Sequence, residues 1–306
     1  MDRITTFSAY NSVVSNLLTA ESNQNQADIQ VSSGKVASDL KGFGANAEAL
    51  TAAQTLQTRV NGYVQNATNV SSQLDAQNTA LTEVADGGQS ARQAIAAAVA
   101  SGSANGLMAS LQSAFSQAAD GLNAQYNGAY LFSGSKVTTP PVSSSTFGPV
   151  MPAFGNDQLA ATTQLNETTK VQTGMLASDI GSPLFAAFQA VAQLDQSSPL
   201  SGPLTQAQQT ALTGLLQTFD AANSGLTESV AQNGLVQNQV SAIQTAQTQR
   251  QTDLQTTIGN MADVDMGQAS AQLANAQTAL QASARVFESL QSTSLLNFLN
   301  SSGVVG

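Results

Sequence analysis

The stretch MGQASAQLANAQTALQASARVFESL, residues 266–290, decides the fold of this chain. Its apolar and small side chains recur at alternating spacings of three and four residues, which is typical of a coiled-coil helix. The positions of this seam are Met266, Ala269, Leu273, Ala276, Leu280, Ser283, Phe287 and Leu290. Because alanines alternate with larger residues, a second helix can approach the seam closely. The stretch therefore predicts a long helix that packs against another helix.

The end of the chain carries more apolar side chains than one partner helix can cover. Those that project away from the seam are Val286, Leu295, Leu296, Phe298 and Leu299. Burying a Leu or Phe side chain contributes roughly 1.5–3 kcal/mol, so leaving several of them in water favours association. Head-to-tail contacts between identical subunits build helical assemblies when the rotation does not close. We interpret this helix as an assembly segment; an ordinary bundle helix with a frayed apolar end is the alternative.

The first residues of the chain repeat the pattern more weakly. Four apolar residues share one helical face before the polar run ESNQNQ begins at Glu21. Because both ends are helical seams, we expect them to lie together and to make contacts with copies of the chain. The predicted assembly interface comprises Ile4, Phe7, Val14, Leu18, Met266, Leu273, Leu280, Phe287, Leu290, Leu295, Leu296, Phe298 and Leu299.

A third seam with the same alternating spacing runs over residues 60–84. Gly87 and Gly88 follow it, and because glycine destabilises a helix interior, we expect the helix to relax or bend there. The amphipathic segment 111–126 predicts a further helix that folds back beside its neighbour.

The middle of the chain has a different character. Residues 127–157 combine aromatic and β-branched residues with glycine and paired prolines, which indicates turns and short strands. We expect this insertion to continue to Gly174, with helical patterning resuming at Leu184. Residues 206–258 predict the returning helices.

These patterns predict a mainly α fold. We expect an elongated helical hairpin or bundle, with paired N- and C-terminal coiled-coil helices and a small β-containing inserted domain. The predicted domains are a terminal coiled-coil assembly domain (1–40 with 262–306), a helical rod (41–133 with 206–261) and a β-containing outer insertion (134–205).

Composition and charge exclude several classes of function. The net charge of −10 argues against nucleic acid as a partner, because affinity for phosphates comes largely from Lys and Arg. The absence of His and Cys excludes Ser-His and Cys-His nucleophiles and most zinc sites. We therefore expect no cofactor, no metal and no enzymatic activity; a hydrolase that uses Asp157 or Glu167 is the remaining alternative.

The short motifs favour structural roles. Asp263 and Asp265 lack the partners of a calcium loop and are interpreted as acids at a helix start. The glycine- and lysine-containing segments 41–46 and 132–136 do not complete a phosphate loop and indicate turns. No run reaches the roughly 18 apolar residues of a membrane helix. The start of the chain lacks the basic and continuous apolar regions of a cleaved signal peptide.

Three stretches resemble the flagellin superfamily, and within it the hook-associated proteins of the hook–filament junction. VSSGKVASD (31–39) resembles the Ser-Gly-Lys turn that follows the first terminal helix. YNGAYLFSGSKVTTPPV (126–142) is similar to the passage that leads into the outer domain of the junction proteins. Residues 263–299 resemble the C-terminal helix, from its Asp-x-Asp start to its Ser-Leu-Leu finish. The segment LKGFGANAEAL (40–50) departs from the Asp-Asp-Pro/Ala pattern of many members.

The resemblance implies a structural subunit of the bacterial flagellum that joins hook to filament. It implies export through the flagellar type III apparatus without a cleaved signal peptide, and an extracellular place at the hook–filament junction. The implied partners are copies of the chain, hook-side and filament-side axial proteins, and a cytoplasmic export chaperone that covers the C-terminal helix.

Two other helical functions are alternatives. A filament flagellin shares the paired terminal helices, but the LFSGSK and Pro140-Pro141 passage favours the junction protein. A signalling coiled coil of the chemoreceptor type needs membrane helices and a continuous heptad array, which the insertion over residues 134–174 opposes.

Overall fold

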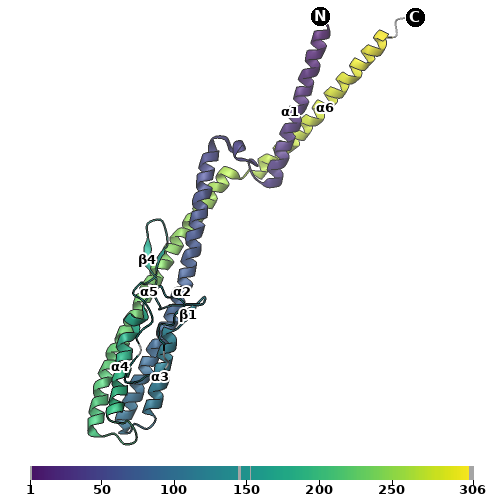
Figure 1. Cartoon of the computed structure of the whole chain (residues 1–306). Helices are drawn as coiled ribbons and strands as arrows, with labels where there is room; N and C mark the ends of the chain where they lie inside the picture. Colours follow the sequence, from purple (N-terminus) through teal and green to yellow (C-terminus); the bar gives the residue numbers. More distant parts are fainter. Residues whose placement is uncertain (1, 144–145, 152, 303–306) are drawn as a thin grey trace. The chain divides into compact units, whose positions relative to one another are not determined.

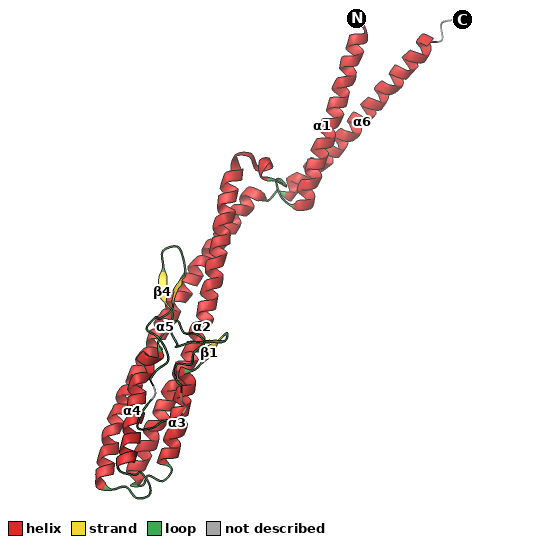
Figure 2. Cartoon of the chain, in the orientation of Figure 1, coloured by secondary structure: helices red, strands yellow, loops and turns green. Residues whose placement is uncertain are grey.

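The structure, a computed structural model, describes residues 2–143, 146–151 and 153–302, and it describes side chains for residues 8, 10–143, 146–151 and 153–292. The fold is mainly α with two small β-hairpins, as predicted (Figure 2). The elements are α1 (Asp2–Ser33), the 3-10 helix η1 (Leu40–Asn46), α2 (Ala47–Ser101), α3 (Leu107–Leu122), β1 (Gln125–Tyr126), β2 (Ala129–Tyr130), β3 (Thr162–Gln164), β4 (Lys170–Gln172), α4 (Ala177–Ser197), α5 (Gln206–Ala262) and α6 (Met266–Ser302).

The chain divides into two compact units. The terminal unit comprises Met1–Arg59 and Gln251–Gly306, and the central unit comprises Val60–Arg250. Helices α2 and α5 each contribute residues to both units. The three-domain division expected from sequence is finer than this one and stays a prediction.

The central unit is a bundle formed by α3, α4 and the parts of α2 and α5 that belong to it (Figure 1). Its core contains a chain of edge-to-face phenylalanine rings from three helices. The ring centroid of Phe188 in α4 lies 5.3 Å from that of Phe115 in α3 and 5.2 Å from that of Phe219 in α5. Such pairs contribute about 0.5–1.5 kcal/mol beyond the burial of their area. Eight of the chain's fifteen Phe and Tyr residues lie in this core or pack against it.

Helix α2 runs without interruption through Gly87 and Gly88, where the helix was expected to relax or bend. These glycines serve close packing between helices instead. A Cβ atom on Gly87 would lie 2.7 Å from the carbonyl oxygen of Ala114 in α3. A Cβ atom on Gly121 in α3 would lie 2.8 Å from the carbonyl oxygen of Ala80 in α2. Each helix therefore places a glycine against the backbone of the other, and the gain in packing outweighs the low helix propensity.

The two hairpins are short and antiparallel. In the first, Tyr126 pairs with Ala129 across Asn127 and Gly128, whose φ angles of 51° and 79° are those of a tight hairpin turn. This hairpin begins just before the segment from which strands were expected. In the second, β3 pairs with β4, and Val171 joins a small apolar cluster with α2 and α5.

Amide side chains hold the inserted segments against the helices. Asn66 donates to the carbonyl of Gln164 at 2.7 Å, and the buried Gln77 donates to that of Thr173 at 3.0 Å. Asn123 exchanges two hydrogen bonds of 2.9 Å with the backbone of Val142. Irregular backbone needs such partners, because an unpaired buried carbonyl or amide destabilises the fold. Across the described ranges, no helix is both long and apolar enough to cross a membrane.

Candidate assembly surface

Helix α6 packs against α1, and the two helices diverge toward the ends of the chain (Figure 1). Between residues 266 and 292, the buried and half-buried side chains fall on the heptad positions alone. They are Ala269, Leu273, Ala276, Leu280, Ser283, Phe287 and Leu290. Met266, the first position of the predicted series, is 48% exposed because α6 begins there.

The seam on α1 differs from the predicted one. The side chains that face α6 follow the same alternation of four and three, and they are Val13, Leu17, Ala20, Gln24, Ala27 and Val31. Of the residues named from sequence, Val14 lies half-buried at the edge of this seam and Leu18 is 60% exposed. Counting backwards from Val31 in steps of four and three residues gives the face of α1 that packs against α6. This face is hard to recognise in the sequence, because the small alanines and the glutamine at its centre differ little from their neighbours.

The predicted interface residues at the two extremities fall outside the described side chains. These residues are Ile4, Phe7, Leu295, Leu296, Phe298 and Leu299. Toward this end of the pair, the ring centroid of Tyr10 lies 5.7 Å from that of Phe287.

At the other end of the pair, the segments that lead into α1 and α6 are joined to each other. The amide of Val36 donates to the carbonyl of Ala262 at 2.8 Å, and the amide of Val264 donates to that of Gly34 at 3.0 Å. Between these two bonds, the ammonium group of Lys35 forms an ion pair with the carboxylate of Asp263. We call this antiparallel contact the linker bridge.

The linker bridge brings together two of the stretches that resemble the flagellin superfamily. The Ser-Gly-Lys turn supplies Gly34 and Lys35, and the Asp-x-Asp motif supplies Asp263. Asp265, the second acid of that motif, accepts hydrogen bonds from the amides of Gly267 and Gln268 at 2.8 and 3.2 Å. It thus caps the first turn of α6, as expected for an acid at a helix start.

The segment that departs from the family pattern forms η1 and the start of α2. Asp39 precedes η1, and its carboxylate accepts a hydrogen bond of 2.9 Å from the amide of Gly42. Gly44 interrupts the helix with a φ angle of 54°, a conformation that glycine adopts readily. The segment is therefore a capped turn rather than a phosphate-binding loop.

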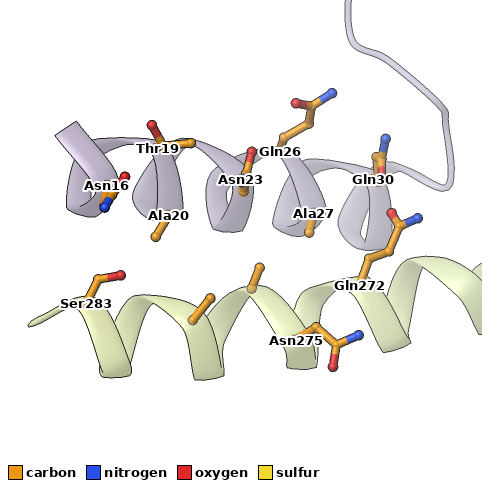
Figure 3. A pocket seen from close by; sticks show the side chains of 12 residues that line it. Asn16, Thr19, Ala20, Asn23, Gln26, Ala27, Gln30, Gln272, Asn275 and Ser283 are labelled. Atoms are coloured by element: carbon orange, nitrogen blue, oxygen red, sulfur yellow. The ribbon is translucent and has the colours of Figure 1, made fainter. Parts of the chain in front are cut away.

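An open groove of about 640 Å³ runs along one flank of the α1–α6 pair (Figure 3). Its floor consists of the small residues Ala20, Ala27, Ala276 and Ala279. Its rims are formed by polar, uncharged side chains, which are Asn16, Thr19, Asn23, Gln26 and Gln30 from α1 and Gln272, Asn275 and Ser283 from α6. We call this feature the amide groove.

Within the described part of the chain, no charged side chain lines the amide groove. Among the described side chains of the pair, the charged residues are Glu21 and Asp28 on α1 and Arg285 and Glu288 on α6. All four lie outside the groove. The flank is therefore electrically neutral although the chain carries a net charge of −10.

The carboxylates considered for catalysis lie elsewhere, in the inserted segments. Asp157 accepts hydrogen bonds from the hydroxyl and amide of Ser135 and from the amide of Leu159. The Ser135 hydroxyl first, and then the two amides, hold the pKa of the Asp157 carboxyl below its ordinary value. Asp157 thus organises a turn. Over the ranges that the structure describes, His, Cys, Asp and Glu side chains form no group that could hold a metal ion.

Both ends of the chain match family models. The bacterial flagellin N-terminal helical region matches residues 4–137, and the bacterial flagellin C-terminal helical region matches residues 216–299. This chain belongs to the flagellin family. As a flagellin-family protein, it is a structural component of the flagellum. No curated protein matches it.

Two solved structures share the fold of this flagellin-family chain. One, from Vibrio parahaemolyticus, is assigned as a flagellar hook-associated protein; it has 17% sequence identity and a TM-score of 0.62, with 74% of this chain and 99% of that chain covered. The other is FlgL of Bacillus cereus, with 15% identity, a TM-score of 0.54, and coverage of 69% of this chain and 98% of that chain. At these identities the likeness shows the fold alone.

Proposed function

We propose that this flagellin-family protein is an adaptor that joins the flagellar hook to the filament and that its terminal helices assemble with copies of the chain. The extracellular hook–filament junction is its proposed location.

The observation that carries this proposal is how little of the α1–α6 pair is buried within one chain. Helices of 32 and 37 residues bury only Ala20, Ala27 and Ala269 among their described side chains. Helices in globular proteins are stabilised mainly by packing an amphipathic face, and a two-helix pair with an alanine-rich seam offers little packing. Leu18, Met266 and Val286 are meanwhile 60, 48 and 51% exposed. Contacts with neighbouring subunits would supply the missing burial.

Two further observations favour the junction over the filament. The two solved structures described above carry the names hook-associated protein and FlgL. The sequence over residues 126–142 resembles the junction proteins, and here it forms the first hairpin and the turn that follows it. Filament flagellin is the second candidate, because both matched helical regions belong to flagellin.

The remaining parts of the proposal concern partners and organisation. Hook-side and filament-side axial proteins are the proposed neighbours, and export without a cleaved signal peptide is the proposed route. A chaperone that covers the C-terminal helix from Phe287 to Leu299 would keep it from associating before export. The division into an assembly domain, a rod and an outer insertion is proposed with them.

The decisive experiment removes the gene from its bacterium. An adaptor's loss should leave hooks without filaments, while filament protein accumulates in the medium. Loss of a sole filament flagellin should instead leave capped hooks and no shed filament protein. Restoration by the full chain, but not by a variant without residues 287–306, would link the function to the terminal helix. Normal filaments in the deletion strain would contradict both candidates.

A further inference from the structure

The amide groove has the dimensions of a seat for a helix. Its α1 rim extends from Asn16 to Gln30, about four helical turns or roughly 20 Å. Ala20 and Ala27 are buried at the bottom of the groove, whereas Ala276 is half-buried and Ala279 is exposed. Another helix can approach the α6 side closely, because the methyl groups of Ala276 and Ala279 project little from the backbone. Figure 3 shows the side chains that line the groove, contributed by both helices.

The rims offer hydrogen-bonding groups to a partner. Each Asn or Gln side chain carries two N–H donors and an acceptor oxygen. Gln30 uses its amide group within the chain, donating to the carbonyl of Val36 at 2.9 Å. Thr19 likewise donates to the carbonyl of Ser15 at 2.8 Å. Within the described part of the chain, no hydrogen bond occupies the side-chain amides of Asn23 and Gln26 on α1 or of Gln272 and Asn275 on α6.

Charge identifies the class of partner. A groove that selects a charged protein gains from charges of the opposite sign, and the described residues that line this groove carry none. Two copies of a chain with a net charge of −10 repel each other, so a contact between them is favoured on surfaces free of charge. The neutrality of the groove therefore suits a second copy of the same chain.

The matching surface lies on the other side of α1. Leu18 and Ala20 are two positions apart, which at 3.6 residues per turn places their side chains on nearly opposite sides of the helix. Leu18 is 60% exposed, whereas Ala20 lies on the groove floor. One chain thus presents an exposed leucine and a groove in different directions, the arrangement that gives an open, repeating contact.

We propose that the amide groove seats the outer face of α1 from a second copy, with that copy's Leu18 between the two amide rims. This inference rests on the proposed self-assembly and names the surface and the chemistry through which it occurs. Hydrogen bonds between amides hold the two copies in register, and burial of Leu18 against Ala276 and Ala279 adds the apolar contact.

Isosteric charge variants of the full chain test the proposal. Gln26→Glu and Gln272→Glu each place a carboxylate in the groove, whereas Gln277→Glu and Gln281→Glu add the same charge to exposed positions of α6 that lie outside the groove and are not on the Leu18 face of α1. Sedimentation over a concentration series measures assembly, and far-UV circular dichroism confirms folding. We expect the groove variants to raise the critical concentration at least about tenfold, because an unpaired charge is disfavoured in an interface. The control variants should shift it less than about twofold.

Cysteine cross-linking supplies an independent readout, because the sequence contains no cysteine. Leu18→Cys and Ala279→Cys are made separately and mixed under oxidising conditions. The mixture should give more disulfide-linked dimer than either variant alone and more than Leu18→Cys mixed with Gln281→Cys.

The outcomes separate the two levels of the proposal. If the wild-type chain stays monomeric at every concentration, both the proposed self-assembly and the proposed groove contact are contradicted. Assembly of the wild-type chain with equal effects of groove and control variants overturns the groove contact alone. Equal cross-linking of Leu18→Cys to both partner positions does the same.

Discussion

The ring of Tyr10 in α1 packs against the ring of Phe287 in α6, with centroids 5.7 Å apart and planes inclined by 42°. It is the one aromatic contact between described side chains of the two helices, and it lies toward the end of the pair opposite to the linker bridge. Elsewhere the seam consists largely of alanine and single leucines. The contact therefore carries a large share of the apolar packing toward the free ends.

Replacing Phe287 with alanine should loosen the pair. Because Phe287 is half-buried, we expect a loss of about 1–2 kcal/mol, less than full burial of its side chain would contribute. Hydrogen exchange of the α1 amides in the full chain measures this loss. Val286→Ala is the matched control: Val286 is 51% exposed, so it should change stability by less than about 0.5 kcal/mol. Equal effects of both substitutions would show that the contact between the Tyr10 and Phe287 rings does not stabilise the α1–α6 pair.

The close approach of α2 and α3 predicts opposite results for one substitution at two sites. Gly87→Ala should destabilise the central unit by about 1–3 kcal/mol, because its new methyl group meets the α3 backbone. Gly225→Ala in α5 should stabilise it by roughly 0.5–1 kcal/mol, because the new methyl group meets open space and alanine favours the helix. Urea unfolding followed by circular dichroism distinguishes the two. Stabilisation by Gly87→Ala would contradict the role assigned to this glycine.

The turn at Asp157 predicts a local dependence on pH. Since hydrogen bonds lower the pKa of this carboxyl in the folded chain, its stabilising effect is complete above the unfolded-state pKa of about 3.9. The effect is lost as the pH falls through the lower, folded-state pKa. Carboxyl NMR should show Ser135→Ala raising the pKa of Asp157 toward its ordinary value. An unchanged pKa would mean that the serine hydroxyl does not stabilise the carboxylate.

The linker bridge predicts that backbone geometry matters more than charge. Gly34 has a φ angle of 69°, so Gly34→Ala should destabilise the bridge by about 1–2 kcal/mol. Lys35→Met should change it by less than about 0.5 kcal/mol, because both members of the ion pair are about half exposed, with side-chain exposures of 51 and 53%. Exchange of the Val36 and Val264 amides reports on both variants. Faster amide exchange in Lys35→Met than in Gly34→Ala would show that the ion pair stabilises the linker bridge more than the backbone conformation of Gly34 does.

The sequence predicted those features of the fold that depend on residues close together in the chain, and it did not predict those that depend on contacts between distant segments. The α6 seam from Ala269 to Leu290 was predicted position by position, because its leucines and Phe287 stand out against polar neighbours. On α1, Val14 and Leu18 are as apolar as Val13 and Leu17, and only contact with a distant helix decides which pair is covered. Pattern alone could not make that choice.

The glycines and the linker bridge show the same limit. Glycine in a helix interior suggests a bend, and the sequence around Gly87 gives no other sign. Its role in close packing is seen only in the folded chain, where Gly87 of α2 lies against α3 and Gly121 of α3 lies against α2. Lys35 and Asp263 each belong to a motif noticed in the sequence, but their contact joins positions 228 residues apart. The neutral groove was likewise not foreseen, because its two rims come from opposite ends of the chain.

The same separation has a consequence for the order of events during synthesis. Proteins are made from the N-terminus, and local structure forms before distant segments meet. The central unit can complete its contacts once residue 250 has been made, but α1 finds its partner only after α6 follows. Closing so long a loop also carries an entropic penalty that nearby contacts avoid. The first helix to leave the ribosome is therefore the last to be paired.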